Sequence, residues 1–277
     1  MPLVSAIIPT FNRVDVLPRS ILSILKQTFQ DIELIVIDDG STDSTADLIA
    51  GMSESIRYLR QDHKGVSAAR NLGIVVSRGK LIAFLDSDDE WSQAKLEKQL
   101  ELYDKADSNF ICHSDELWLK HGKVVNQKNV HKKQGGRFFE RALQRCLISP
   151  SAVLISRLLL DKIGLFNEEL PAAEDYDLWL RITAFHSVKF VNEPLVIKHG
   201  DRSDQLSKTI PAIDRFRIQA ILNILQNPEL QSDYRRAAIR ELVKKCEILA
   251  KGLSKHGKDE EAIRYYELSN KYQNNNY

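Results

Sequence analysis

The residues best suited to chemistry follow directly after a short apolar segment near position 85. Residues 81–85 read Leu-Ile-Ala-Phe-Leu, and carboxylates follow at Asp86, Asp88 and Asp89. Because side chains alternate along an extended backbone, Asp86 and Asp88 should face the same side. Two oxygen ligands that face one way suit a divalent cation that also contacts phosphate oxygens. A solvated acidic turn, capping a helix that begins near Trp91, is the alternative explanation of these three residues.

A second acidic turn follows the apolar segment 32–37, where Asp38 and Asp39 precede Gly40. A carboxylate is a strong acceptor for the single imide N–H of a pyrimidine base. An aspartate here would therefore provide affinity for such a base and discriminate against bases that lack this donor. We assign this role to Asp39, with a turn cap as the alternative. For Asp38 we prefer the turn cap.

The N-terminal part predicts strands that alternate with helices. The predicted strands are residues 4–8, 32–37, 56–60 and 81–85, and the predicted helices are residues 17–27, 45–52 and 68–77. Such alternation specifies a largely parallel sheet with right-handed crossovers. The carboxyl ends of its strands share one edge, where open α/β sheets bind their ligands. We therefore expect Pro9, Asp39 and Asp86 to lie in one site.

Four segments in the same order resemble the inverting family 2 glycosyltransferases. They are residues 4–13, 34–43, 65–71 and 84–89, which read VSAIIPTFNR, LIVIDDGSTD, GVSAARN and FLDSDD. The likeness covers residues 1–100 and resumes at 174–179, EDYDLW. The resemblance implies a GT-A fold, which is an α/β fold with a mixed, mostly parallel sheet flanked by helices. It also implies an enzyme that moves a sugar from a nucleotide-diphospho-sugar, most often a UDP-sugar.

The resemblance implies a role for each matching residue of the donor site. The residues implied to bind the donor are Pro9, Thr10, Asn12, Asp39, Arg70, Asp86 and Ser87. Asp39 would accept the imide N–H of uracil, Arg70 would lie beside the base and the phosphates, and Asp86 would hold the ribose. Asp88 would bind a Mn²⁺ or Mg²⁺ ion that bridges the diphosphate, whose developing charge as a leaving group needs a cation.

Two further positions match the family at sites for the metal and the acceptor. His199 would complete the metal site as a neutral imidazole ligand. It is followed by Gly200 where the family usually has a proline or a similar residue, so a plain turn histidine is the alternative. Asp175 would be the base that deprotonates the acceptor hydroxyl, and Glu174 would orient the acceptor. Acids in the first turn of a helix are often only caps that complement its dipole, which is the alternative here.

The middle of the chain predicts less regular structure. We expect a strand over 109–119, a lysine-rich loop or hairpin over 120–136, and short strands over 188–191 and 195–198. The lysine-rich segment could be a lid over the diphosphate, although a solvated excursion explains its composition equally simply. A flexible loop is expected over 202–207.

The organisation predicted from these elements is a GT-A domain over 1–210, followed by an α-helical extension over 211–277. Residues 1–100 would form the nucleotide-binding half of the domain and residues 101–210 the acceptor half. The extension should hold helices over 213–226, 233–254 and 260–272. Its segment 235–258 has eight Lys or Arg against two acids, a composition that suits peripheral contact with an anionic membrane or merely a solvated face. Packing against a second subunit, in a homo-oligomer, is a further expectation.

Composition limits the classes of function. The chain has 277 residues, 43% of them hydrophobic, and a net charge of +1, which disfavours nucleic acid as a partner. Its three cysteines are odd in number and widely spaced, which is typical of buried thiols in a reducing compartment. With no apolar span of membrane length, we expect a cytoplasmic protein, at most peripheral to the inner face of the membrane.

Three functions are compatible with these features. The leading one is an inverting, metal-dependent transfer of a sugar from a UDP-sugar to a hydroxyl of a glycan or lipid-linked acceptor. A non-catalytic nucleotide-sugar sensor or scaffold would keep Asp39 and Asp86 but would not need Asp175. A sugar-1-phosphate nucleotidyltransferase is disfavoured, because its glycine-rich phosphate loop is not present at 9–12, Pro-Thr-Phe-Asn.

Overall fold

The computed structural model describes residues 1–52, 55–125, 128–200 and 209–274. The predicted loop 202–207 therefore lies outside the described residues. By contacts, the chain divides into two compact units. We call Met1–Gly136, Leu147–Pro171 and Ser187–Arg202 the sheet unit. We call Arg137–Cys146, Ala172–His186 and Ser203–Tyr277 the helical unit.

The strands of the described chain form one mixed sheet in the sheet unit. Its order is β3-β2-β1-β4-β8-β6-β9-β5, and β7 pairs with β6 outside this path. The parallel part consists of β1 (Val4–Thr10), β2 (Ile32–Asp38), β3 (Ile56–Arg60) and β4 (Leu81–Phe84). Its helices are α1 (Leu17–Leu25), α2 (Thr45–Met52), α3 (Val66–Val76), α4 (Lys95–Leu100) and α6 (Arg157–Ile163). All four predicted strands and three predicted helices of this part are therefore confirmed.

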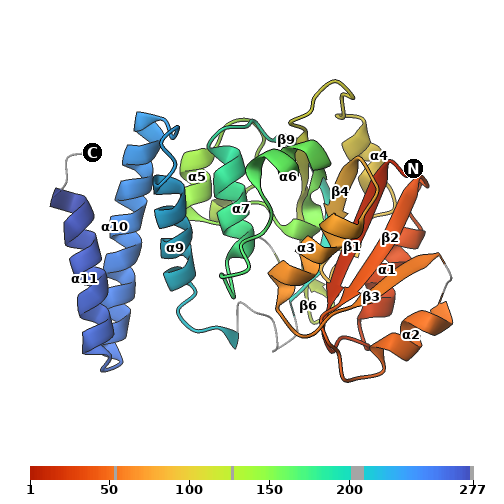
Figure 1. The fold of residues 1–277 in the computed structure, drawn as a ribbon, viewed down its shortest axis with the longest axis horizontal. Helices are drawn as coiled ribbons and strands as arrows, with labels where there is room; N and C mark the ends of the chain where they lie inside the picture. Colours follow the sequence, from red (N-terminus) through yellow and green to blue (C-terminus); the bar gives the residue numbers. More distant parts are fainter. Residues whose placement is uncertain (53–54, 126–127, 201–208, 275–277) are drawn as a thin grey trace. The chain divides into compact units, whose positions relative to one another are not determined.

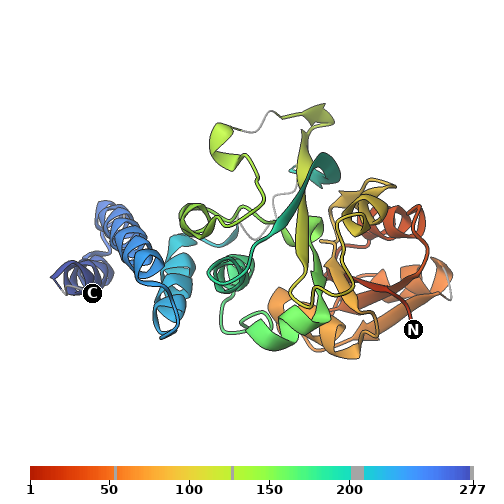
Figure 2. The same cartoon turned by 90° about the horizontal axis from the view of Figure 1, so that it is seen from above.

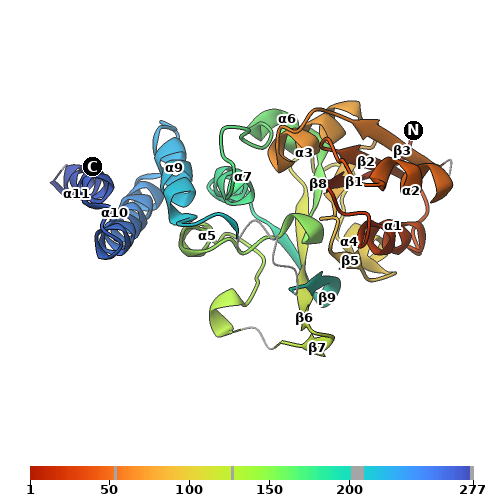
Figure 3. The ribbon, with the colours of Figure 1, turned by 90° about the horizontal axis from the view of Figure 1, so that it is seen from below.

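Helices cover both faces of the parallel strands, which explains why these strands are continuously apolar. Figure 3 shows α3 and α6 on one face and α1 and α4 on the other. The approach of α3 to β1 is close: a Cβ atom on Gly73 would lie 2.4 Å from Cγ2 of Ile7. Glycine at this position lets α3 pack directly on the central strand, so that its N-terminus is fixed relative to the sheet.

The remaining strands extend the sheet with mixed directions. They are β5 (Glu90–Trp91), β6 (Ile111–Lys120), β7 (Lys123–Val124), β8 (Leu154–Ser156) and β9 (Lys189–His199). β8 is antiparallel to both β4 and β6, whereas β6 and β9 run parallel and lie side by side (Figure 2).

Two predictions about these strands are wrong. The segments 188–191 and 195–198 belong to the single strand β9, because irregular pairing opposite Ser114, Asp115 and Glu116 absorbs the residues around Pro194. The helix expected near Trp91 is absent there: β5 pairs with β9, and α4 begins only at Lys95. The acidic turn at 86–89 therefore joins two strands and caps no helix.

The lysine-rich segment begins as a hairpin and ends attached to the sheet. His121 and Gly122 both have positive φ, as a tight hairpin between β6 and β7 requires. Further along, Lys133 lies buried with its Nζ 2.5 Å from Oε1 of Glu116. Although burial opposes ionisation, the charge of Lys133 lowers the pKa of Glu116 to about 2. The end of this segment is thus anchored rather than solvated.

The helical unit contains the predicted C-terminal helices and two earlier ones. Its helices are α5 (Phe139–Gln144), α7 (Glu174–Thr183), α9 (Asp214–Leu225), α10 (Ser232–Lys255) and α11 (Asp259–Asn274). Figure 1 shows α9, α10 and α11 side by side. α7 contacts α9, since Nδ2 of Asn223 donates to Asp177 at 3.2 Å. It also contacts α5, since the Tyr176 hydroxyl donates to the carbonyl of Leu143 at 2.6 Å. This division differs from the boundary expected between residues 210 and 211.

The three cysteines differ in burial. Cys112 and Cys246 are buried as expected, but Cys146 is only partly buried, which corrects the prediction for that residue.

None of the described helices is long and apolar enough to cross a membrane.

Lys95 is a fully buried lysine in the core of the sheet unit. Its Nζ donates to Oε1 of Gln99 at 2.7 Å and lies 4.1 Å from the centroid of the Trp91 ring. Burial lowers the pKa of Lys95 from 10.5 to about 7. Between these two values the unfolded chain binds more protons than the folded chain, so the free energy of unfolding should rise with pH. The rise from this group should be at most about 1.4 kcal/mol per pH unit.

We expect Lys95→Met to flatten this rise, as measured by urea unfolding at about pH 7, 8 and 9. The matched control is Lys98→Met on the same helix, where the ammonium pairs with Glu193 at the surface. The control should keep the slope of the wild-type protein. A wild-type slope in Lys95→Met would show that this lysine is not the source of the pH dependence.

Candidate functional site

The ends of β1 and β2 bring several predicted donor residues together. Pro9 and Thr10 are buried at the end of β1, and Thr10 lies opposite Asp38 on β2. The amide of Asp39 donates to the carbonyl of Thr10 at 2.8 Å. Within the described chain, the buried hydroxyl of Thr10 has no hydrogen-bond partner. Because β2 and β4 both run parallel to β1, the strand ends at Pro9, Asp39 and Asp86 share one edge of the sheet, as predicted.

The Asp39 carboxylate organises the segment that leads from β3 into α3. It is 3% exposed. Its Oδ1 accepts from Nε2 of Gln61 at 2.6 Å and from the amide of Lys64 at 2.9 Å. Its Oδ2 accepts from the amide of Gly65 at 2.9 Å and lies 2.8 Å from Nδ1 of His63. These contacts use about four acceptor sites of a carboxylate, so a nucleobase imide would have to replace one of the two side-chain partners.

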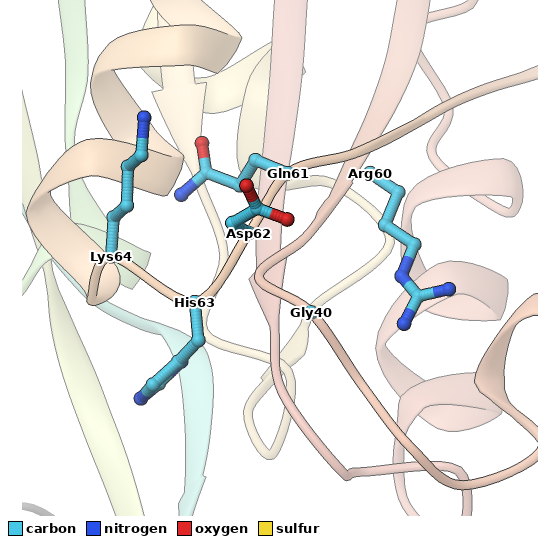
Figure 4. A pocket seen from close by; sticks show the side chains of 6 residues that line it. All are labelled: Gly40, Arg60, Gln61, Asp62, His63 and Lys64. Carbon is cyan, nitrogen blue, oxygen red and sulfur yellow. The ribbon is translucent and has the colours of Figure 1, made fainter.

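A shallow open pocket of about 730 Å³ lies beside this segment. Figure 4 shows its lining, which comes from the turn after β2, the last residue of β3 and the segment that follows β3: Gly40, Arg60, Gln61, Asp62, His63 and Lys64. The ring of His63 also stacks on Phe11, with centroids 4.1 Å apart and planes 21° from parallel. Sequence reasoning missed Phe11 and His63, because a lone aromatic residue in a loop and a lone histidine carry no spacing signal.

Asn12 and Asp38 shape the turns around this pocket. Oδ1 of Asn12 accepts from the backbone amide of Thr42 at 2.8 Å. The backbone amide of Asn12 donates to Oγ of Ser41 at 2.9 Å. Asn12 therefore ties the turn after β1 to the turn after β2, and its predicted donor contact stays a prediction. Oδ1 of Asp38 accepts from the amide of Ser41 at 2.8 Å, so the expected turn cap is confirmed.

In the acidic turn after β4, each aspartate is paired with a different cation. The pairs are Asp86 with Arg70 at 2.7 Å, Asp88 with Arg13 at 3.2 Å, and Asp89 with Lys198 at 3.1 Å. Burial opposes ionisation of Asp86, but the charges of Arg70 and Lys198 outweigh it and hold the pKa of this carboxyl below its usual value. The turn is therefore largely charge-compensated, which sequence spacing could not show.

Arg70 and Ser87 occupy specific positions in this turn. Arg70 is buried, and its guanidinium lies 5.2 Å from the centroid of the Phe166 ring as well as beside Asp86. Ser87 is also buried, and its carbonyl accepts from the hydroxyl of Ser20 at 2.8 Å. Both residues lie where the donor site was predicted, and their contacts with a donor stay predictions.

The metal site predicted at Asp88 and His199 stays a prediction. Among the described residues, no group of three or more His, Cys, Asp or Glu is arranged to hold a metal. The side chain of Asp88 is 15% exposed, and Nε2 of His199 lies 3.6 Å from Glu90. This donor set does not suit a cage made by protein ligands alone. It suits Mg²⁺ or Mn²⁺ bound through one or two protein ligands and substrate phosphates.

The predicted base lies in the helical unit, in the first turn of α7. Oδ2 of Asp175 accepts from Sγ of Cys146 at 3.2 Å, and Oδ1 accepts from the amide of Tyr176 at 2.6 Å. Burial and the neighbouring Asp175 carboxylate raise the pKa of the Cys146 thiol well above its usual value, so it stays a donor. Glu174, the residue before Asp175, is buried. Cys146 was not singled out from the sequence, since a thiol 29 positions away gives no local pattern.

Comparison with known proteins gives consistent results. The family model described as "Glycosyl transferase family 2" matches residues 5–164. A UDP-Glc:alpha-D-GlcNAc-diphosphoundecaprenol beta-1,3-glucosyltransferase of Escherichia coli, WfgD, is 34% identical over 192 residues, which are 69% of this chain and 73% of that protein. A second E. coli enzyme with the same description, WfaP, is 34% identical over 71% of this chain and 76% of its own length. The chain spans only 26% to 63% of the length of five rickettsial relatives, which are described as uncharacterized glycosyltransferases.

Solved structures show the same fold. The crystal structure of Staphylococcus aureus TarS 1-349 in complex with UDP-GlcNAc has a TM-score of 0.69 and 16% identity, covering 98% of this chain and 91% of that one. The predicted GT-A fold, with its mixed sheet, flanking helices and C-terminal helices, is therefore confirmed. Because the family model covers residues 5–164, more than half of the sequence, the chain belongs to glycosyl transferase family 2.

Proposed function

We propose that this protein is an inverting, metal-dependent glycosyltransferase that moves a sugar from a UDP-sugar to a hydroxyl of a lipid-linked glycan. The observation that carries the proposal is the acidic turn after β4, where Asp86 pairs with Arg70 and Asp88 pairs with Arg13. This turn follows a parallel strand of a family 2 fold, at the edge where open α/β sheets bind their ligands. The two E. coli relatives are named for UDP-Glc and for a GlcNAc-diphosphoundecaprenol acceptor. UDP-Glc and UDP-GlcNAc are accordingly the first donors to test.

In this proposal the nucleobase binds near Asp39 and the ribose near Asp86. The Asp39 carboxylate accepts the uracil imide after Gln61 or His63 gives up its contact, since both are side chains that can rotate away. The backbone donors of Lys64 and Gly65 stay in place and keep the carboxylate oriented. The exposed ring of Phe11, stacked on His63, offers a flat apolar surface for a base.

The diphosphate and its metal are assigned to the other end of the acidic turn. Asp88 would hold the Mn²⁺ or Mg²⁺ ion, with His199 as the second protein ligand. When bound, such an ion stabilises the charge that develops on the leaving nucleoside diphosphate. Asp175 would accept the proton of the acceptor hydroxyl, and Glu174 would orient the acceptor.

A screen of nucleotides for thermal stabilisation tests the proposal. Binding to the native state alone stabilises by about 2.7 kcal/mol at a ligand concentration of 100 Kd, which should raise Tm by several degrees. We expect UDP, UDP-Glc or UDP-GlcNAc with Mn²⁺ to give this shift, and GDP and CMP to give much less. Transfer to a synthetic GlcNAc-diphospho-polyprenol, followed by mass spectrometry, then identifies the reaction. Absence of stabilisation by every uridine nucleotide would contradict the proposal.

Membrane contact and oligomer formation stay predictions. On α10, Lys244, Ile248, Lys251 and Lys255 share an exposed stripe, and the side chain of Ile248 is 55% exposed. Other basic residues of this helix are used internally: Arg235 donates to the carbonyl of Leu225 at 2.7 Å. The face available to an anionic surface is therefore smaller than the composition of 235–258 indicates.

A further inference from the structure

Lys198, near the end of β9, reaches the acidic turn from a distant part of the sequence. Pairing of Trp91 with Val196 and of Glu90 with Ile197 brings β9 alongside β5, which follows the turn directly. Nζ of Lys198 lies 3.1 Å from Oδ2 of Asp89 and 3.0 Å from Oγ of Ser149. The side chain stays 28% exposed, so solvent reaches part of it.

Asp89, one partner of Lys198, is itself fixed. Asp89 is 2% exposed, and its Oδ2 accepts from the hydroxyl of Ser151 at 2.6 Å. Oγ of Ser151 in turn accepts from the amide of Asp86 at 3.1 Å. The ammonium of Lys198 is thereby held in a defined position relative to the turn that carries Asp86 and Asp88. Such pre-organisation reduces the entropy that a long lysine side chain loses on binding.

The ammonium of Lys198 has three N–H donors, and within the described chain two acceptors, Asp89 and Ser149, receive its hydrogen bonds. One donor is therefore available for a ligand on the exposed side.

We propose that Lys198 binds the diphosphate of the donor nucleotide, and that Asp89 and Ser149 are positioning residues that aim its ammonium. Lys198 would then share with the divalent cation the neutralisation of the leaving diphosphate. This inference rests on the proposed function for the identity of the donor. The competing explanation is that Lys198 only neutralises the buried Asp89 and never meets a ligand.

Replacing Lys198 by methionine separates these explanations when UDP and uridine are compared as probes. Loss of a charge-assisted hydrogen bond to phosphate should weaken UDP binding about 10- to 100-fold in calorimetry. Uridine, which lacks phosphate, should change by less than about twofold in an NMR titration. Lys198→Arg should keep most of the affinity for UDP. The surface variant Lys98→Met, whose ammonium pairs with Glu193, is the matched control and should bind both probes normally.

A double variant guards against the effect of an uncompensated buried carboxylate. Lys198→Met leaves Asp89 without its cation, which can disturb the fold, whereas Lys198→Met with Asp89→Asn removes the pair together. If Lys198 contacts the diphosphate, the double variant stays about as weak for UDP as the single one. Recovery of wild-type UDP affinity in the double variant would overturn the inference, as would an equal loss for UDP and uridine.

The same measurements keep this inference apart from the proposed function. Wild-type protein that binds no uridine nucleotide would overturn both. Wild-type protein that binds UDP normally, together with an unaffected Lys198→Met, would overturn only the role of Lys198.

Discussion

Asp175→Asn is expected to lower the turnover of sugar transfer by about 100- to 10,000-fold, the usual contribution of a general base. Direct displacement with inversion needs a group that takes the proton of the acceptor hydroxyl as the new bond forms. Asparagine keeps the shape of aspartate and the acceptor oxygen that meets Cys146, but it cannot take that proton. Affinity for UDP should be unchanged, because the change leaves the donor residues of the sheet unit intact. Initial rates and calorimetry with UDP measure the two quantities.

Two variants control this result. Asp233→Asn changes an acid on α10 of the same helical unit, where it pairs with Arg236 at the surface, and should transfer sugar at the wild-type rate. Glu174→Gln should raise the KM of the acceptor more than it lowers kcat, if Glu174 orients the acceptor. Unchanged turnover in Asp175→Asn would remove the proposed base and favour a non-catalytic binding protein.

Asp88→Ala is expected to abolish the enhancement of UDP binding by Mn²⁺ and to lower turnover at least about a hundredfold. The ion would lose its main protein ligand, and charge stabilisation of a leaving diphosphate by a metal is worth several kcal/mol. The variant also removes one negative charge from the acidic turn, which lessens the repulsion of the diphosphate. UDP binding without metal should therefore be kept or slightly strengthened. Calorimetric titration of UDP with Mn²⁺ and then with chelator measures the difference.

Neighbouring variants distinguish the roles within the site. Asp86→Ala should weaken UDP with or without metal, because a hydrogen bond to ribose does not need the ion. His199→Ala should loosen Mn²⁺ binding several-fold and leave metal-free UDP affinity unchanged. If Mn²⁺ still enhanced UDP binding by Asp88→Ala as strongly as by the wild-type protein, the assignment of Asp88 as a metal ligand would be contradicted.

The parallel half of the sheet was predictable, because its strands are short apolar segments separated by helices and turns. The partners of the acidic residues were not. The contacts of Asp39 come from a segment more than 20 positions later, and Lys198 reaches Asp89 only through the pairing of β9 with β5. The helix predicted near Trp91 failed because tertiary pairing overrode local capping signals. The grouping of α5 and α7 with the C-terminal helices could not be predicted, since the contacts of α7 join residues far apart in the sequence.

The order in which the chain passes between the two units constrains how the protein can assemble during synthesis. β6 ends at Lys120 and its parallel partner β9 begins at Lys189, while the segments Arg137–Cys146 and Ala172–His186 between them belong to the helical unit. At typical elongation rates, β6 is made roughly 3 to 14 s before β9, and one of its edges must wait unpaired for that time. α5 and α7 must likewise wait for α9 and α10. A nascent chain of this kind exposes strand edge and apolar helix surface to chaperones, and no single cut in the gene separates one unit from the other.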